Sequence, residues 1–282
     1  MYLVVSKAGV YKVISTLKSL NPLYFVLAVL IYICTLYIST IRWRLLLPDD
    51  LRTKKLFSLY LIGSLFNHVL PGMVGGDAVK AYYLYKDTGK APAAIASVFM
   101  DRYVGFTGLM FIGVAAFPFG LRYFHGSYIE WMLPAIIALF LVASFVIFRI
   151  KIGRKIKFLF ELYEYFALYK NKHHILFKAF LISVFVQVLV VLAVYLLCLG
   201  MGLNVPLVPM FIFIPIITTL AMVPVSISGI GIREASFVLL LGSLGVSSTH
   251  ATAVAFAWFL SLVTGSLPGL IEYLRYEKKT TG

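Results

Sequence analysis

Charged side chains are scarce in this 282-residue chain, and acidic side chains are the scarcest. Only 13% of the residues are charged, and the 25 Lys and Arg residues outnumber the 11 Asp and Glu residues. A soluble domain usually carries about 25% charged residues. The hydrophobic share of 61% and the mean hydropathy of +0.96 exclude an ordinary soluble fold, so the chain is predicted to lie in a membrane.

Sequence patterns of covalent, metal-dependent or nucleotide-dependent chemistry are also missing. The two cysteines, Cys34 and Cys198, both lie inside apolar runs, where we expect them to pack and to form neither a disulfide nor a metal site. Neither His173-His174 nor His250 has a Cys, Glu or Asp at metal-ligand spacing. No Gly-x-Ser-x-Gly or Walker sequence occurs, and no strand can precede the glycines of GIGIRE as a dinucleotide site requires. The sequence therefore predicts no cofactor, and it predicts a protein that is not an enzyme.

Long apolar runs are abundant, and they predict membrane-spanning helices. About 20 apolar residues suffice for a helix to cross ~30 Å of hydrocarbon. The short alternating segments typical of a transmembrane barrel are absent. The chain is thus predicted to be an all-α polytopic membrane protein with about five full spans, at residues 23–41, 93–119, 131–148, 179–199 and 251–274.

The distribution of positive charge predicts how these spans are oriented. The connection 149–178 holds eight Lys and Arg residues against two Glu, and segments 42–55 and 275–279 are also basic. Because cytoplasmic loops collect Lys and Arg, all three are predicted to lie in the cytoplasm beside a cell membrane. The bilayer then also accounts for the net charge of +14, so we expect anionic headgroups and no nucleic acid as partners.

Two further apolar segments fit no simple span. Segment 56–85 begins and ends among lysines and breaks at Pro71 and Gly72, which predicts a re-entrant hairpin of two half-helices. Segment 211–244 breaks at 224–231 and would enter from the other side. The chain is therefore predicted to form one transmembrane domain over residues 1–282. Its inverted halves, 20–119 and 179–275, are joined by the span 131–148 and the basic loop 149–178. This layout is typical of secondary transporters. Two ordinary short spans within 211–244 are the alternative.

The two breaks share a pattern that points to an anion site. PGMVGGDAVK (71–80) and PVSISGIGIR (224–233) both have Pro, then Gly five residues later, and a base at the end. Free N–H groups and the dipole at the start of a half-helix favour an anion. Lys80 and Arg233 are therefore predicted to bind a phosphate-bearing headgroup, close to the main chain at the glycines Gly75, Gly76, Gly229 and Gly231.

The remaining polar residues near the breaks have a structural interpretation beside the functional one. Asp77 with Lys80, and Arg233 with Glu234, are spaced to form ion pairs that merely hold the hairpins. Asp101 and Arg102 lie in the span 93–119, where the same two interpretations apply.

Three aromatic or histidine positions complete the candidates. His68 precedes the first break, where it either contacts the cavity or serves as a hydrogen-bonded packing residue. The sequence Arg42-Trp43-Arg44 and the single Trp131 are expected to be interfacial anchors.

Four segments carry a family resemblance: RWRLLL (42–47), NHVLPGMVGGDAVKAY (67–82), ASVFMDRY (96–103) and VPVSISGIGIREA (223–235). In this order they resemble the flippase-like transmembrane region of lysylphosphatidylglycerol synthases and its stand-alone relatives, over residues 20–275. The resemblance carries over to the residues already named at the breaks and in the span 93–119. Lys80 stands where the family often has Arg, and Asp101 where it often has Glu. The similarity involves no aminoacyl-transferase domain, so lysyl transfer is not implied.

The resemblance implies that the chain moves an anionic phospholipid or a polyprenyl-phosphate-linked lipid across the membrane, as a flippase or scramblase. Two alternatives remain open at this point. One is a membrane-embedded enzyme that modifies a lipid phosphate, with Asp77, Asp101 or Glu234 as acid or base. The other is a scaffold subunit of a lipid-modifying or glycosyltransferase complex. The expected partners are the bilayer, an anionic lipid headgroup, and either a lipid-modifying enzyme or a second copy of the chain.

Overall fold

The computed structural model describes residues 9–47, 51–70, 75–150, 157–167, 169, 172–222 and 231–281. Within these ranges the regular structure consists of helices, and no strand occurs. The prediction of an all-α fold is confirmed.

Long apolar helices form the frame of the molecule. They are α3 (Pro22–Leu45), α6 (Ala91–Gly120), α9 (His173–Gly200) and α12 (Ser248–Ser266), which continues after a break at Leu267 as α13 (Pro268–Thr281). Four helical stretches are long and apolar enough to cross a membrane, namely Pro22–Leu45, Ala91–Tyr123, His173–Gly200 and Ser248–Lys278. The shorter α7 (Ile129–Phe145) is extended by a π-helical turn, η2 (Val146–Ile150). The protein is therefore a multi-pass membrane protein, and the five predicted spans all correspond to helices.

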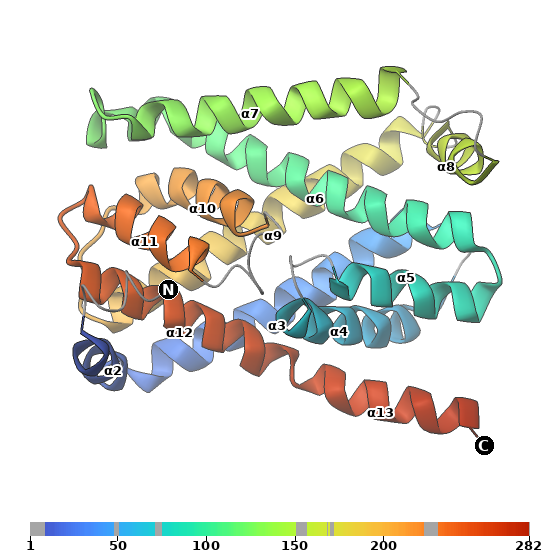
Figure 1. Ribbon diagram of the computed structural model, residues 1–282, viewed down its shortest axis with the longest axis horizontal. Coiled ribbons are helices and arrows are strands. Elements are labelled where there is room, and N and C mark those ends of the chain that lie inside the picture. The colour runs from blue at the N-terminus through green and yellow to red at the C-terminus, as the bar shows by residue number, and fades with distance from the viewer. Residues whose placement is uncertain are drawn as a thin grey trace.

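Two helical hairpins enter this frame from opposite ends (Figure 1). The first consists of α4 (Thr53–Val69) and α5 (Gly75–Thr88), and the second of α10 (Leu207–Ala221) and α11 (Ile232–Gly242). In Figure 1 the first pair lies toward the right-hand end of the bundle and the second toward the left-hand end. Both predicted breaks separate two helices as expected, although residues 71–74 and 223–230 themselves lie outside the described residues.

Helices of the first half of the chain pack against helices of the second half. The spans α3 and α9 contact each other along the bundle, and α6 packs against both α9 and α10. From the second half of the chain, α12 packs against α3, and α12 and α13 together cover α4. Each hairpin is thus supported by a span from the other half, whereas the domain division drawn from the sequence stays a prediction.

Glycines allow the close approaches that this packing needs. Gly63 of α4 faces Gly76 of α5, and a Cβ on Gly76 would overlap the carbonyl oxygen of Gly63. Gly108 of α6 approaches Ser183 of α9, where an added Cβ would lie 2.7 Å from the serine Cβ. Small residues at such contacts let helix backbones approach in membranes, where no hydrophobic effect drives helices together.

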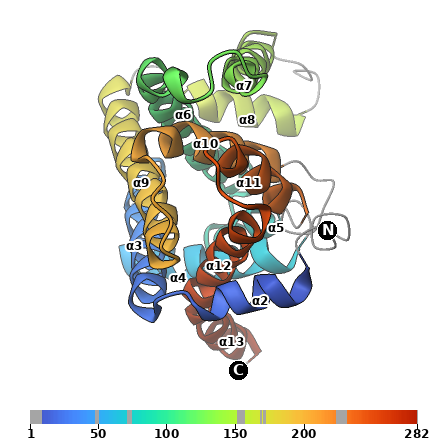
Figure 2. The ribbon, with the colours of Figure 1, turned by 90° about the vertical axis from the view of Figure 1, so that its left-hand side faces the viewer.

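Two short helices lie across the spans, at opposite ends of the bundle. These are α2 (Val10–Lys18) and α8 (Lys157–Ala167), which are seen end-on in Figure 1 and lengthwise in Figure 2. The hydroxyls of Tyr165 and Tyr169 both donate to the carbonyl of Leu46, which attaches α8 and the turn that follows it to the end of α3. A short 3₁₀ turn, η1 (Leu121–Tyr123), follows α6.

The basic connections gather at one end of the bundle. The end of α3, the start of α4, helix α8, the start of α9 and the end of α13 all lie toward the right-hand end in Figure 1. Their placement agrees with the charge pattern from which a cytoplasmic end was predicted. The orientation of that end toward the cytoplasm stays a prediction.

Candidate functional site

Asp101 of α6 is the centre of a buried ion network. Its Oδ1 accepts a hydrogen bond from Arg42 Nε at 2.8 Å. Its Oδ2 accepts from Lys80 Nζ at 3.2 Å and from the hydroxyl of Tyr60 at 2.9 Å. The Asp101 side chain is 1% exposed. Since the four residues come from α3, α4, α5 and α6, the carboxylate joins the first hairpin to both spans beside it.

Arg42 and Trp43 are buried, so the expectation that they anchor the protein at the membrane interface is wrong. The guanidinium of Arg42 donates from Nη1 to Ser183 Oγ of α9 at 3.0 Å, in addition to its bond with Asp101. The indole N–H of Trp43 donates to Ser97 Oγ at 3.3 Å. Helix α3 continues to Leu45, so residues 42 and 43 stay on its packed side, while Arg44 is exposed.

Lys80 is enclosed on all the sides that the structure describes. Its Nζ lies 4.5 Å from the ring centroid of Trp43 and 4.1 Å from that of Tyr60, and the side chain is 3% exposed. It is the sixth residue of α5 and therefore lies beyond the first turn of that half-helix. Cation–π contacts and a carboxylate at hydrogen-bonding distance compensate its burial. In this conformation Lys80 holds the hairpin and is not open to a ligand.

Asp77 and Arg102 form the accessible edge of the same network. The Nε of Arg102 donates to Asp77 Oδ2, and Lys80 Nζ lies 3.9 Å from Asp77 Oδ1. The side chain of Arg102 is 39% exposed, in contrast to the buried Lys80. Counting Arg42, the described residues of the network are three bases and two acids, so a further anion would balance their charge.

A groove of about 610 Å³ begins at this edge. Asp77 and Arg102 supply its charged side chains, and the rest of its wall is formed by Ala78, Ala81, Tyr82, Tyr85, Ala91, Ile95, Val98, Phe99 and Met222. Tyr82, Tyr85 and Ile95 are exposed on the surface of the bundle, so the groove opens sideways between α5 and α6. Met222 follows α10, which brings the second hairpin to the same groove.

Arg233 and Glu234 begin the second half-helix of the other hairpin. Arg233 donates from Nη2 to Glu234 Oε1 at 2.8 Å, and the other oxygen of Glu234 accepts from the N–H of Gly231. The Arg233 guanidinium lies 4.5 Å from the ring centroid of Phe259. His68 contacts the same ring, with 6.2 Å between centroids.

This second cluster keeps unused hydrogen-bonding capacity. Arg233 Nη1 and His68 Nδ1 are buried and have no hydrogen-bond partner among the described residues. His68 Nε2 lies 3.4 Å from the hydroxyl of Tyr32, which is bound to Ser64 Oγ at 2.6 Å. A buried guanidinium N–H without an acceptor is costly, so a bound anion would satisfy it.

The structure therefore groups the residues predicted from sequence into two clusters. One holds Gly75, Gly76, Asp77, Lys80, Asp101 and Arg102, where the N–H of Gly76 also donates to Asn67 Oδ1 at 3.0 Å. The other holds His68, Gly231, Arg233 and Glu234. Gly229 lies outside the described residues. Their roles in binding stay predictions.

Tyr60 was not among the residues predicted from sequence, and Arg42 was expected at the membrane interface and not in this network. A signal for Arg42 was present, because Thr35, Ser39 and Arg42 are spaced four and three residues apart and form a polar stripe along an apolar helix. Tyr60 had no such signal, since tyrosine is common in membrane helices.

The predictions from sequence also concern metal binding and the two cysteines. No group of three or more His, Cys, Asp or Glu residues is arranged there to hold a metal ion. Cys198 is buried as expected, whereas Cys34 is exposed on the surface of α3 and does not pack as predicted.

Comparison with known proteins supports the family suggested by the sequence. A UPF0104 membrane protein of Methanocaldococcus jannaschii is 30% identical over 148 residues, which cover 50% of this chain and 44% of that relative. Two UPF0104 membrane proteins of Methanothermobacter thermautotrophicus are 23% and 22% identical over 84% and 97% of this chain, and over 80% and 89% of their own lengths. No solved structure matches the chain. The family model for the lysylphosphatidylglycerol synthase TM region matches residues 1–269, so the chain belongs to this family of membrane proteins.

Proposed function

We propose that the protein moves an anionic phospholipid, or a polyprenyl-phosphate-linked lipid, between the two leaflets of the membrane. The observation that carries the proposal is the groove between α5 and α6. It has one charged end, at Asp77 and Arg102, and otherwise apolar walls. An amphiphile has the same division, with a charged head and an apolar tail.

The headgroup phosphate would bind at the accessible edge of the ion network. Arg102 is exposed to the groove and is held in place by Asp77, and the network around it carries one more base than acids. Arginine binds phosphate well because its planar guanidinium offers several N–H donors. The tail would stay beside Ile95 and Tyr82, at the side that opens on the surface of the bundle.

Passage to the other leaflet would use the second hairpin. Met222 lines the groove next to the end of α10, and beyond the break Arg233 has a buried N–H that finds no acceptor in the described part of the chain. A headgroup leaving Arg102 would thus meet a second cationic group contributed from the opposite end of the bundle. Hairpins that break in the middle and enter from both sides are typical of transporters with alternating access.

The test is lipid translocation in proteoliposomes that contain fluorescent phosphatidylglycerol or fluorescent phosphatidylcholine. Bleaching from outside measures the lipid that reaches the outer leaflet. The native protein is expected to move phosphatidylglycerol faster than phosphatidylcholine. Since a hydrogen bond to a charged group contributes ~1.5–3 kcal/mol, Arg102→Gln should slow phosphatidylglycerol about tenfold or more.

Matched variants distinguish a loss of headgroup binding at Arg102 from a general effect of removing one positive charge. Arg275→Gln removes an arginine from an exposed ion pair with Glu272, 2.8 Å apart, and should leave the rate unchanged. Arg102→Lys keeps the charge and loses the planar fork, so an intermediate rate is expected. Arg233→Gln should slow the same lipid by removing the second cation.

Equal rates for the native protein and Arg102→Gln would contradict the proposal, as would equal transport of both lipids. No movement of either lipid or of a polyprenyl-phosphate probe would favour the enzyme or scaffold alternative. Product formation from the lipid in detergent, where no leaflets exist, would then identify an enzyme.

A further inference from the structure

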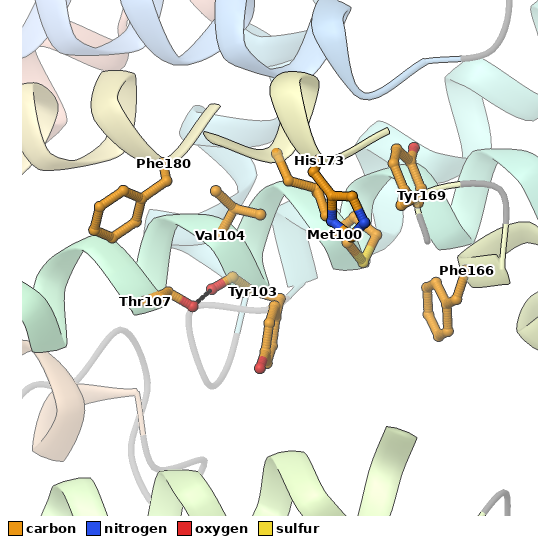
Figure 3. A pocket seen from close by; sticks show the side chains of 9 residues that line it. Met100, Tyr103, Val104, Thr107, Phe166, Tyr169, His173 and Phe180 are labelled. Atoms are coloured by element: carbon orange, nitrogen blue, oxygen red, sulfur yellow. Dashed lines mark hydrogen bonds between the residues drawn. The ribbon is translucent and has the colours of Figure 1, made fainter. Parts of the chain in front are cut away.

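A second cavity lies on another face of α6, away from the groove. Its volume is about 360 Å³, within the range of ligand sites. It is lined by residues of α6, the end of α8 and the start of α9, namely Met100, Tyr103, Val104, Thr107, Phe166, Tyr169, His173, Leu176 and Phe180 (Figure 3). On α6 the groove contacts Ala91, Ile95, Val98, Phe99 and Arg102, so the two cavities use different sides of the helix. Phe99 separates them at one edge, where its ring packs against Phe166.

The wall of this cavity is almost entirely apolar in character. The hydroxyl of Thr107 donates to the carbonyl of Tyr103 at 2.9 Å, and the hydroxyl of Tyr169 donates to the carbonyl of Leu46. Figure 3 shows the rings of Phe166 and Phe180 on either side of the cavity. An aliphatic chain would therefore fit the interior, because these hydroxyls already have acceptors.

The rim of the cavity carries an exposed histidine. His173 is exposed at the first turn of α9, and Lys172 precedes it. Helix α8 crosses the spans at this end of the bundle, as expected of an amphipathic helix at the membrane surface. A ligand with a tail inside and an anionic head at the rim matches both parts.

We propose that this cavity binds one tail of an anionic membrane phospholipid, whose phosphate lies beside His173 at the membrane surface. This lipid is resident and is not carried across, since its cavity lies on a different side of α6 from the groove. It fixes α8 against α6 and α9. The proposal does not depend on transport through the groove, and either can fail alone.

Thermal unfolding in neutral detergent tests the binding of this lipid. Added phosphatidylglycerol is expected to raise the melting temperature of the native protein more than phosphatidylcholine does, because a ligand that binds the folded state stabilises it. His173→Glu places a negative charge at the rim. The apparent affinity for phosphatidylglycerol should fall about fivefold, the effect of one charge near a lipid surface.

His174→Glu is the matched control. His174 is also exposed, but it does not line the cavity. Its replacement by Glu changes the net charge of the protein as much as His173→Glu does. The His174→Glu variant should bind phosphatidylglycerol with the same affinity as the native protein. Equal losses in both variants, or equal stabilisation by both lipids, would overturn the proposal.

A second measurement locates the tail directly. Phe166→Trp introduces an indole into the cavity wall, and phosphatidylglycerol with brominated chains, added in small amounts to detergent, should quench the extra fluorescence. The native tryptophans Trp43, Trp131 and Trp258 supply the background, which is measured in the native protein. Quenching no stronger than this background would refute the assignment, even if His173→Glu weakened binding.

Discussion

Replacing Asp101 by asparagine tests whether the buried ion network holds the first hairpin in place. Asp101 is the acceptor for Arg42, Lys80 and Tyr60, and its side chain is 1% exposed. In Asp101→Asn the nearest carboxylate to Lys80 is Asp77, 3.9 Å away. The hydrogen bond of Arg42 to Ser183 brings no negative charge. The three bases of the network then share one acid, Asp77, so two cations are left in excess.

The size of the effect follows from this count. Removing one partner of a buried ion pair costs about 3–5 kcal/mol, because the other charge stays buried without compensation. Asp101→Asn should lower the free energy of unfolding by that amount. Lys80→Met should cost less, since it leaves Arg42 and Asp101 paired one to one. In the double variant, the cost of Asp101→Asn should be partly recovered because one of the two unpaired cations is gone.

The assay is reversible unfolding of the purified protein in mixed micelles with increasing sodium dodecyl sulfate, followed by circular dichroism. Arg275→Gln serves as the control, because its ion pair is exposed and such pairs contribute only ~0–1 kcal/mol. If Asp101→Asn unfolded like this control, the network would not stabilise the hairpin. If the double variant were no more stable than Asp101→Asn, the charge count would be wrong.

The remaining predictions concern backbone contacts. Gly76→Ala should destabilise the protein by about 1–3 kcal/mol, because the added Cβ overlaps the carbonyl of Gly63, whereas Gly242→Ala has no atom within 4 Å and should be neutral in the same unfolding assay. Tyr169→Phe should cost about 1 kcal/mol by removing a hydrogen bond to Leu46 and should speed proteolysis of the connection before α9, which limited trypsin digestion measures.

The frame of the molecule could be predicted from sequence because each part has a local cause. Long apolar runs specify the spans, and the proline and glycine at Pro71 and Gly72 interrupt the helix in a segment too short to cross twice. The distribution of Lys and Arg among the connections then limits the ways to thread the segments through the membrane. These signals need no knowledge of which helices touch.

The ion network could not be derived in the same way. Asp101 and Arg42 are 59 residues apart, and a sequence without structure does not say which base meets which acid. Trp43, next to Arg42, resembles an interfacial anchor by composition. Both residues are buried by the packing of α3 against α4, α6 and α9, which the sequence of α3 does not specify.

The groove was still less predictable. It exists because Ala78, Ala81 and Ala91 leave space between α5 and α6 that larger side chains would fill. Alanine is ordinary in a membrane helix, so nothing in the sequence marked these positions. The prediction of Lys80 as a ligand came from its place after the break, whereas the contact of Arg102 with the groove required the structure.

The packing of α13 on α4 has a consequence for the order in which the fold closes. Ser58 donates a hydrogen bond to Glu272 at 2.6 Å, and Tyr83 donates one to Glu277 at 2.8 Å. Both acceptors lie more than 190 positions later in the chain than their donors. During synthesis, α4 and α5 are inserted long before this cover exists. The first hairpin to enter the membrane is thus among the last to be covered by its neighbours. Until α13 is in place, we expect the polar side chains of this hairpin to contact the insertion machinery or lipid headgroups.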